Sequence, residues 1–306
     1  MLEAKKPKIS HLFKRLRKEP IEVILLLCAS FSIIILFLML FFIAGEGSQA
    51  LSRFGINFLI GQRWETNEHL FGAFPLIYGS VMVVAGALAI AIPIGVATAI
   101  FITEILPFTL RDIVKSVIEL LASIPSIIYG LIGVVYLAPF IASFFGIQSG
   151  TVALTASIVL SIMAVPTIVG VSGEILSAVP KEYKEAALAM GATKWQVIKN
   201  VVIPTAKSGI FASVILGFGR AIGETVAVLM VAGSVAVIPT PPWNFLSPVY
   251  PITAVIAMQM GEAAVGSLEY SALFGLGLIL FIVTFIVNTA ADMIAEKETK
   301  IRSAKK

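Results

Sequence analysis

The chain has 306 residues, of which 58% are hydrophobic and only 13% are charged, and its formal net charge is +4. Its mean hydropathy of +0.99 excludes an ordinary soluble domain. Most of a chain this apolar must face lipid or other apolar helices. The mild excess of basic residues calls for no nucleic-acid partner, because membrane topology accounts for it, as shown below.

Six apolar runs are long enough to cross a hydrocarbon core, which takes roughly 20 residues of helix. They cover residues 22–44, 73–102, 117–144, 150–173, 208–237 and 270–293. Because lipid offers no hydrogen bonds to bare backbone, each run should be an α-helix. The expected organisation is a basic tail at 1–21, a six-helix membrane domain at 22–293 and a second basic tail at 294–306.

The first run follows basic residues, as a secretory signal would. It is longer than the apolar core of such a signal and lacks a clear cleavage site before Gly45, so we interpret it as a retained anchor. The single cysteine, Cys28, lies inside it and permits no internal disulfide. The two histidines, His11 and His69, are too few and too far apart to predict a metal site.

The distribution of basic residues predicts the orientation. If residues 1–21, 103–116, 175–207 and 294–306 are placed inside, 19 of the 22 Lys and Arg residues are cytoplasmic. Only Arg53 and Arg63 then lie outside, and Arg220 lies within the fifth run. By the positive-inside rule both termini are expected in the cytoplasm of a multi-pass plasma-membrane protein.

The third run carries Glu119, Ser123, Ser126 and Gly130 at steps of three and four residues, which would share one face of a continuous helix. Pro125 would free backbone carbonyls beside them. These positions predict part of a pore wall, and packing through small residues is an equally good interpretation of the serines.

The loop between the fourth and fifth runs predicts two short helices with a corner. Pro180 suits a first helical position, Gly191 suits a left-handed helix end, and Thr193 can cap the next helix. One face should form a flat knob for a partner's groove, while three charged residues stay free to face solvent or partner. The knob residues are Tyr183, Ala186, Ala187 and Met190, and the charged residues are Lys181, Glu182 and Lys184.

The fifth run places Arg220 and Glu224 near its middle. An arginine at the bilayer centre costs about 2.5 to 3.5 kcal/mol on insertion scales, and such residues usually face a bundle interior or an aqueous path. On a continuous helix these two residues share a narrow stripe with Gly209, Ser213 and Gly217, which we expect to line the pore. Glu224 would partly neutralise Arg220, so that an anion is held loosely. A buried ion pair that only locks the helix is the alternative.

Two external loops, 45–72 and 238–269, remain. The second opens with five prolines between Pro239 and Pro251, which forbid a regular helix there. A stiff connector and a lip that receives a substrate-delivery protein are equally good interpretations.

Glu185-Ala186-Ala187, then Gly191, then Val201-x-Ile203-Pro204 resemble the EAA loop of ABC importer permeases. In that family the loop docks on the ATPase subunit, which implies this role for Glu185, Ala186, Ala187, Gly191 and Pro204. The chain has no Walker A sequence of its own, so ATP and Mg²⁺ are expected on the partner.

The segment from Arg220 to Gly233, together with Met260–Ala263 and Tyr270–Phe274, resembles PstC-type phosphate permeases. The resemblance implies an all-α, type I importer permease (MetI-like) fold that carries inorganic phosphate and is not itself an enzyme. It implies a PstA-like permease partner, two PstB-like ATPases and a PstS-like binding protein. It also implies a substrate path at Arg220 and Glu224, to which the sequence adds Ser123, Ser126, Ser213 and Gly217.

Three alternatives stay open at this point. Sulfate or molybdate could replace phosphate, because one arginine does not distinguish oxyanions. An ion-coupled secondary transporter or channel could use the same charged residues but would leave the EAA loop unexplained. A membrane scaffold or phosphate sensor would show regulation without transport.

Overall fold

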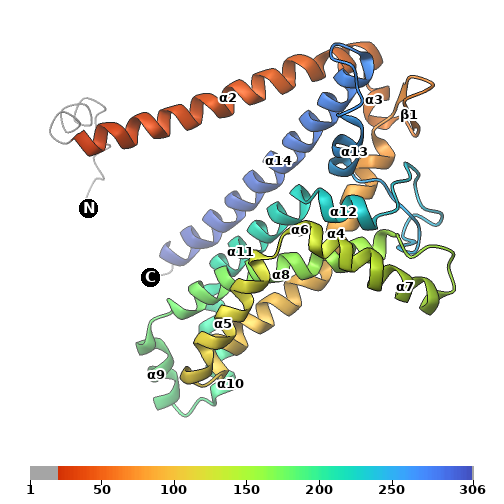
Figure 1. The fold of residues 1–306 in the computed structure, drawn as a ribbon. Coiled ribbons are helices and arrows are strands. Elements are labelled where there is room, and N and C mark those ends of the chain that lie inside the picture. Colours follow the sequence, from red (N-terminus) through yellow and green to blue (C-terminus); the bar gives the residue numbers. More distant parts are fainter. Residues whose placement is uncertain (1–19, 305–306) are drawn as a thin grey trace.

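The computed structural model describes residues 20–304 and is almost entirely helical, as the composition predicts (Figure 1). The helices begin with α2 (Pro20–Phe54), α3 (Asn57–Ile60), α4 (Phe74–Ile100), α5 (Phe108–Ser123), α6 (Ser126–Ile132), α7 (Ala138–Phe145) and α8 (Ala153–Ser177). They continue with α9 (Lys181–Ala189), α10 (Lys194–Val197), α11 (Ile203–Gly223), α12 (Val226–Val231), α13 (Ile252–Gln259) and α14 (Leu268–Ala304). Three π-helical turns, η1 (Phe101–Ile105), η2 (Gly133–Leu137) and η3 (Ile198–Val202), join neighbouring helices. A small antiparallel hairpin pairs β1 (Trp64–Glu65) with β2 (Leu70–Phe71).

Six segments of the described chain are long and apolar enough to span a membrane, which agrees with the predicted number. They are Val23–Phe54, Phe74–Ile105, Ser126–Phe145, Ala153–Ser177, Lys194–Gly223 and Leu268–Ala290. The predicted tail at 1–21 lies almost wholly outside the described residues. The predicted tail at 294–306 is a continuation of helix α14 as far as Ala304.

The first span was predicted to end before Gly45. It continues as helix through Phe54 instead. Gly47 is part of the reason, because a Cβ atom there would lie 3.0 Å from the backbone nitrogen of Gly275. The glycine permits close packing of α2 against α14 and therefore belongs inside the helix.

The third span was predicted as one helix over 117–144, and this is wrong. Ile124 and Pro125 are extended, with ψ angles of 128° and 139°. Helix α5 therefore ends at Ser123, and the spanning segment starts at Ser126. The restriction that a proline places on the preceding residue explains the break at Ile124.

The fifth span was predicted as one helix over 208–237, and this is also wrong. Helix α11 ends at Gly223, Glu224 is extended with a ψ angle of 126°, and the short α12 follows. Beyond Val231 the chain forms no helix until α13, so the proline-rich part of the loop is irregular, as predicted.

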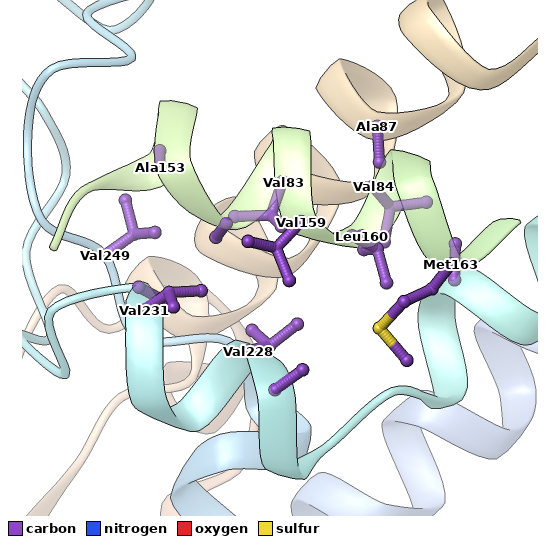
Figure 2. Close-up of a cluster of buried hydrophobic side chains, with 14 of the residues drawn as sticks. Val83, Val84, Ala87, Ala153, Val159, Leu160, Met163, Val228, Val231 and Val249 are labelled. Atoms are coloured by element: carbon purple, nitrogen blue, oxygen red, sulfur yellow. The ribbon is translucent and has the colours of Figure 1, made fainter. Parts of the chain in front are cut away.

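Helix α8 lies at the centre of the bundle, between α4 and α11. In the most apolar stretch of α8, 61% of the residues are buried within the chain, whereas in the most apolar stretch of α2 none of the residues is buried. Figure 2 shows one part of this core, where Val159 and Leu160 of α8 lie beside Val83 of α4 and Val228 of α12. The broken fifth span is thus supported on the central helix.

Helix α2 contacts the rest of the chain mainly through α14. The contacts lie in its second half, where Phe42 meets Phe274 edge to face and Ala50 is fully buried. Toward the N-terminus the two helices diverge, and α2 extends away from the other helices (Figure 1).

Candidate functional site

Arg220 lies in the last turn of α11, and its side chain is exposed. Its Nε atom donates a hydrogen bond to the backbone carbonyl of Met163 in α8, at 3.1 Å. This is the hydrogen bond that the structure gives Arg220 among residues 20–304. The root of the guanidinium is thereby fixed to the central helix, while its outer end faces away from the core.

Glu224 lies in the break between α11 and α12 and is partly buried. Its Oε1 atom accepts a long hydrogen bond of 3.5 Å from the amide of Ala227, and its carbonyl accepts one of 3.0 Å from Thr253 Oγ1. The prediction that Glu224 and Arg220 share a stripe of one continuous helix is wrong, because the helix ends between them. In the part of the chain that the structure describes, the two residues form no ion pair.

The stripe of small residues on α11 packs against α8. Ser213 is fully buried, and its hydroxyl lies 2.6 Å from that of Ser172. A Cβ atom on Gly217 would lie 2.7 Å from Ile168, and one on Gly209 would lie 2.5 Å from Ile175. Within this chain Ser213 and Gly217 form the contact surface between two helices, and their place on a substrate path stays a prediction.

Ser123 and Ser126 lie on opposite sides of the break in the third span. Ser123 is exposed and donates to the carbonyl of Leu120 at 2.7 Å, and Ser126 is partly buried at the start of α6. The hydroxyl of Tyr129 donates across the break to the carbonyl of Leu121, also at 2.7 Å. The predicted single face with Glu119 and Gly130 does not exist, because two helices carry these residues.

The two breaks lie close together, which the sequence did not predict. A Cβ atom on Gly130 would lie 3.1 Å from the Cα atom of Ala227, and one on Gly133 would lie 2.7 Å from Val231. Helices α6 and α12 therefore run parallel in contact, and the breaks that precede them lie at about the same level. Glycines at these two positions were the only sequence signal for this close approach.

The corner in the 181–204 loop is formed as predicted. Gly191 has a φ angle of +85°, and Thr193 caps α10 in a capping box with Gln196. The two hydrogen bonds of this box measure 2.8 and 3.3 Å. One detail differs, since Pro180 precedes the first helical residue of α9 as its cap.

The predicted knob is only partly exposed. Ala187 is buried against the chain's own core, whereas Tyr183, Glu185, Ala186 and Met190 are exposed. Met190 is 85% exposed, and Trp195 on α10 adds a further apolar side chain at 62%. An apolar surface therefore remains on the outside of the loop.

Pro204 follows the π-helical turn η3 at the start of α11. A proline inside an α-helix clashes with the carbonyl four residues earlier, and the wider π turn relieves this clash. The loop and the fifth span thereby form one uninterrupted segment from Lys194 to Gly223.

Lys184 was expected to be free and is not. Its Nζ atom lies 2.6 Å from Oε1 of Glu104, at the far end of the second span. This contact joins residues 80 positions apart, and no local pattern in the sequence indicates it.

At the opposite end of the molecule the hairpin and the proline-rich loop enclose an open groove of about 810 Å³. Its lining comes from residues 62–68 and 236–242. Trp64 forms part of the wall and donates from Nε1 to the side chain of Gln259 at 2.9 Å, which fixes the hairpin to α13.

Residues 91–300 match the family model of the binding-protein-dependent transport system inner membrane component. The chain belongs to this family. It is therefore a multi-pass inner-membrane permease subunit and not an enzyme, and transporters of this class work with an ATPase and a substrate-binding protein. Family membership contradicts the alternative of an ion-coupled secondary transporter.

Relatives of known name are similar over most of their length. The phosphate transport system permease protein PstC of Mesorhizobium japonicum is 42% identical over 79% of each chain. PstC of Xylella fastidiosa (strain Temecula1) is 39% identical over 81% of each chain. The probable ABC transporter permease YqgH of Bacillus subtilis is 39% identical over 76% of this chain and 74% of its own.

Solved structures support the fold. A chain of the bacterial alginate ABC transporter matches with a TM-score of 0.63 and 17% identity, over 94% of this chain and 98% of that one. A chain of the methionine transporter MetNI in an inward-facing conformation matches with a TM-score of 0.54 and 21% identity, over 74% and 94%. The predicted type I importer permease fold is confirmed.

Proposed function

We propose that this chain is one half of the membrane pore of an ATP-driven importer of inorganic phosphate. The observation that carries the proposal is the exposed side chain of Arg220 beside the break between α11 and α12, in a chain 42% identical to a named phosphate permease. Guanidinium stays protonated and presents several donors in a plane, which suits the oxygens of phosphate.

The contacts around Arg220 favour weak and reversible binding. Its Nε atom is occupied by the Met163 carbonyl, which leaves the outer nitrogens to meet a passing anion. Glu224 is near in sequence but is not paired with Arg220, so its charge lowers the local positive potential without closing the site. A translocation path needs this balance, because an anion that is held tightly is not released.

The second part of the proposal concerns energy supply. We propose that a PstB-like ATPase with bound ATP and Mg²⁺ docks on the exposed surface of α9 and α10. Support comes from Glu185 and Ala186 at the family's motif positions and from the exposed side chains of Met190 and Trp195. Gly191, with its positive φ angle, holds the angle between the two helices.

The third part concerns the other partners. The divergence of α2 from the bundle leaves lateral room for a second permease chain of PstA-like type (Figure 1). The groove between residues 62–68 and 236–242 offers an outer surface for a PstS-like binding protein. In this arrangement both termini and the 181–204 loop are cytoplasmic.

The experiment is uptake of labelled phosphate into vesicles that contain this chain and the three presumed partners. We expect ATP-dependent uptake that unlabelled phosphate suppresses and that sulfate and molybdate do not. Arg220→Gln should abolish uptake while assembly and basal ATPase activity persist. Arg220→Lys is the matched control for charge, and we expect it to retain a reduced rate because lysine keeps the charge without the planar donors.

Two results would contradict the proposal. If sulfate or molybdate competes as well as phosphate, the substrate is another oxyanion. If Arg220→Gln causes the complex to dissociate, Arg220 serves packing and not the path.

A further inference from the structure

Lys184 and Glu104 form an ion pair, at an Nζ–Oε1 distance of 2.6 Å. Their side chains are only 22% and 10% exposed. Lys184 lies in the middle of α9, and Glu104 lies in η1 at the end of the second span. The pair therefore joins the 181–204 loop directly to a membrane helix from which it is remote in sequence.

The backbone around Glu104 is specialised. The π-helical turn η1 is a rare conformation, and such turns are frequently found at functional sites. It is fixed from both sides, because Thr103 Oγ1 donates back to the carbonyl of Ala99 and the Thr103 carbonyl accepts from the guanidinium of Arg111. The Nη2 atom of Arg111 is thereby bound to the backbone, and the carboxylate of Glu104 pairs with Lys184.

Apolar contacts support the same junction. Ala187, one turn after Lys184, is buried in a cluster with Ile102 of η1, Val197 of α10 and Val202 of η3. Alanine contributes little contact area, so this packing alone tolerates sliding of α9 over the cluster. The ion pair adds a directional contact that fixes the register of α9 against η1.

We propose that Lys184 and Glu104 are positioning residues for energy coupling, which hold α9 to the end of α4 so that a displacement of α9 moves the second span with it. The inference rests on the proposed docking of the ATPase on α9. Without the pair, the contact between α9 and η1 would rest mainly on the apolar packing around the small side chain of Ala187. Movement of α9 would then be absorbed at the corner near Gly191.

The experiment uses the complete complex and exchanges the two charges. Lys184→Glu and Glu104→Lys are made singly and together, and Lys199→Glu is the control. Lys199 lies in η3, outside the proposed docking surface on α9 and α10, is exposed and has no ion pair within the described part of the chain. Three quantities are measured: the ATPase retained on the permease, the basal rate of ATP hydrolysis, and the phosphate imported per ATP hydrolysed.

We expect each single exchange to lower the phosphate imported per ATP about tenfold, within the usual range of coupling between sites. The ATPase should remain bound, and basal hydrolysis should persist. The double exchange should restore the ratio to within about threefold of wild type, and Lys199→Glu should leave it unchanged. A ratio of this kind does not depend on how much folded complex is recovered, so a purely structural loss would not produce it.

Two results would overturn the inference. If both single exchanges keep the wild-type ratio, the pair has no role in coupling. If Lys184→Glu releases the ATPase and the double exchange does not restore it, Lys184 contacts the ATPase directly. Failure of the docking proposal is seen separately in Ala186→Trp, which should release the ATPase if the enzyme docks on α9 and should not if it docks elsewhere.

Discussion

The two sides of α11 differ in their surroundings. One side carries Gly209, Ser213 and Gly217 and is pressed against α8, with no space for even one added carbon at the glycines. The last turn carries Arg220, whose side chain is exposed and donates a hydrogen bond to the Met163 carbonyl of α8. The difference shows that small residues and a charged residue in one membrane helix can have different roles, one in packing and the other in presenting a charge. Here the small residues fix the helix so that the charged residue is presented at a defined point.

The largest expected effect is on the packed side. Gly217→Val should destabilise the fold by about 1 to 3 kcal/mol, because its Cβ atom would overlap Ile168. The matched control is Gly219→Val on the same helix, where an added Cβ meets nothing within 4 Å. Thermal unfolding of the purified protein in detergent should separate the two variants. Equal unfolding temperatures for the two variants would show that Gly217 is not needed for close packing of α11 against α8.

A smaller effect is expected at the C-terminal end of α11, beside Arg220. Glu224→Gln removes a negative charge near Arg220, so phosphate should be held more tightly and released more slowly. We expect the apparent KM for phosphate and the maximal uptake rate to fall together, each by about fivefold. Stability should stay within about 0.5 kcal/mol of wild type, as for other substitutions outside the core. A rise in KM would mean that Glu224 assists binding.

The smallest effect concerns the buried serines. Ser213→Ala should cost about 0.5 to 1 kcal/mol, since hydrogen bonds between membrane helices are weak. Ser172→Ala should cost the same, and the double variant should cost less than the sum, because the two hydroxyls contact each other. Unfolding free energies and phosphate uptake of the three variants test this. Additive costs would mean that the two hydroxyls do not stabilise each other, and a loss of uptake with normal stability would assign these serines a role in transport.

The sequence was most informative where structure is set locally. Gly191 and Thr193 specify the corner, because a left-handed residue and a capping threonine act within a few neighbours. The number of spans followed from hydropathy alone. The EAA motif and the segment after Arg220 were sufficient to predict the family, since both are contiguous in sequence.

The breaks in the third and fifth spans could not be predicted in the same way. At Glu224 the chain leaves the helix without a proline, and the freed carbonyl is satisfied by Thr253, 29 residues away. Pro125 was recognised as a disturbance, but the extended turn is bridged by the side chain of Tyr129. The sequence predicts a free Lys184, because its partner Glu104 is 80 residues distant and no local pattern joins them. In each case a contact between distant residues decided the outcome.

The π-helical turn η2 affects how the third span tolerates changes in length. A π turn holds one residue more than an α turn, so it can take up an insertion without rotating the helix on either side of it. Removing one residue from Gly133–Leu137 should convert the turn to ordinary α-helix and leave Tyr129 and Ile141 facing as before. The same deletion a turn earlier would rotate every later side chain by about 100°. Natural variation in the length of this span should therefore be concentrated at η2.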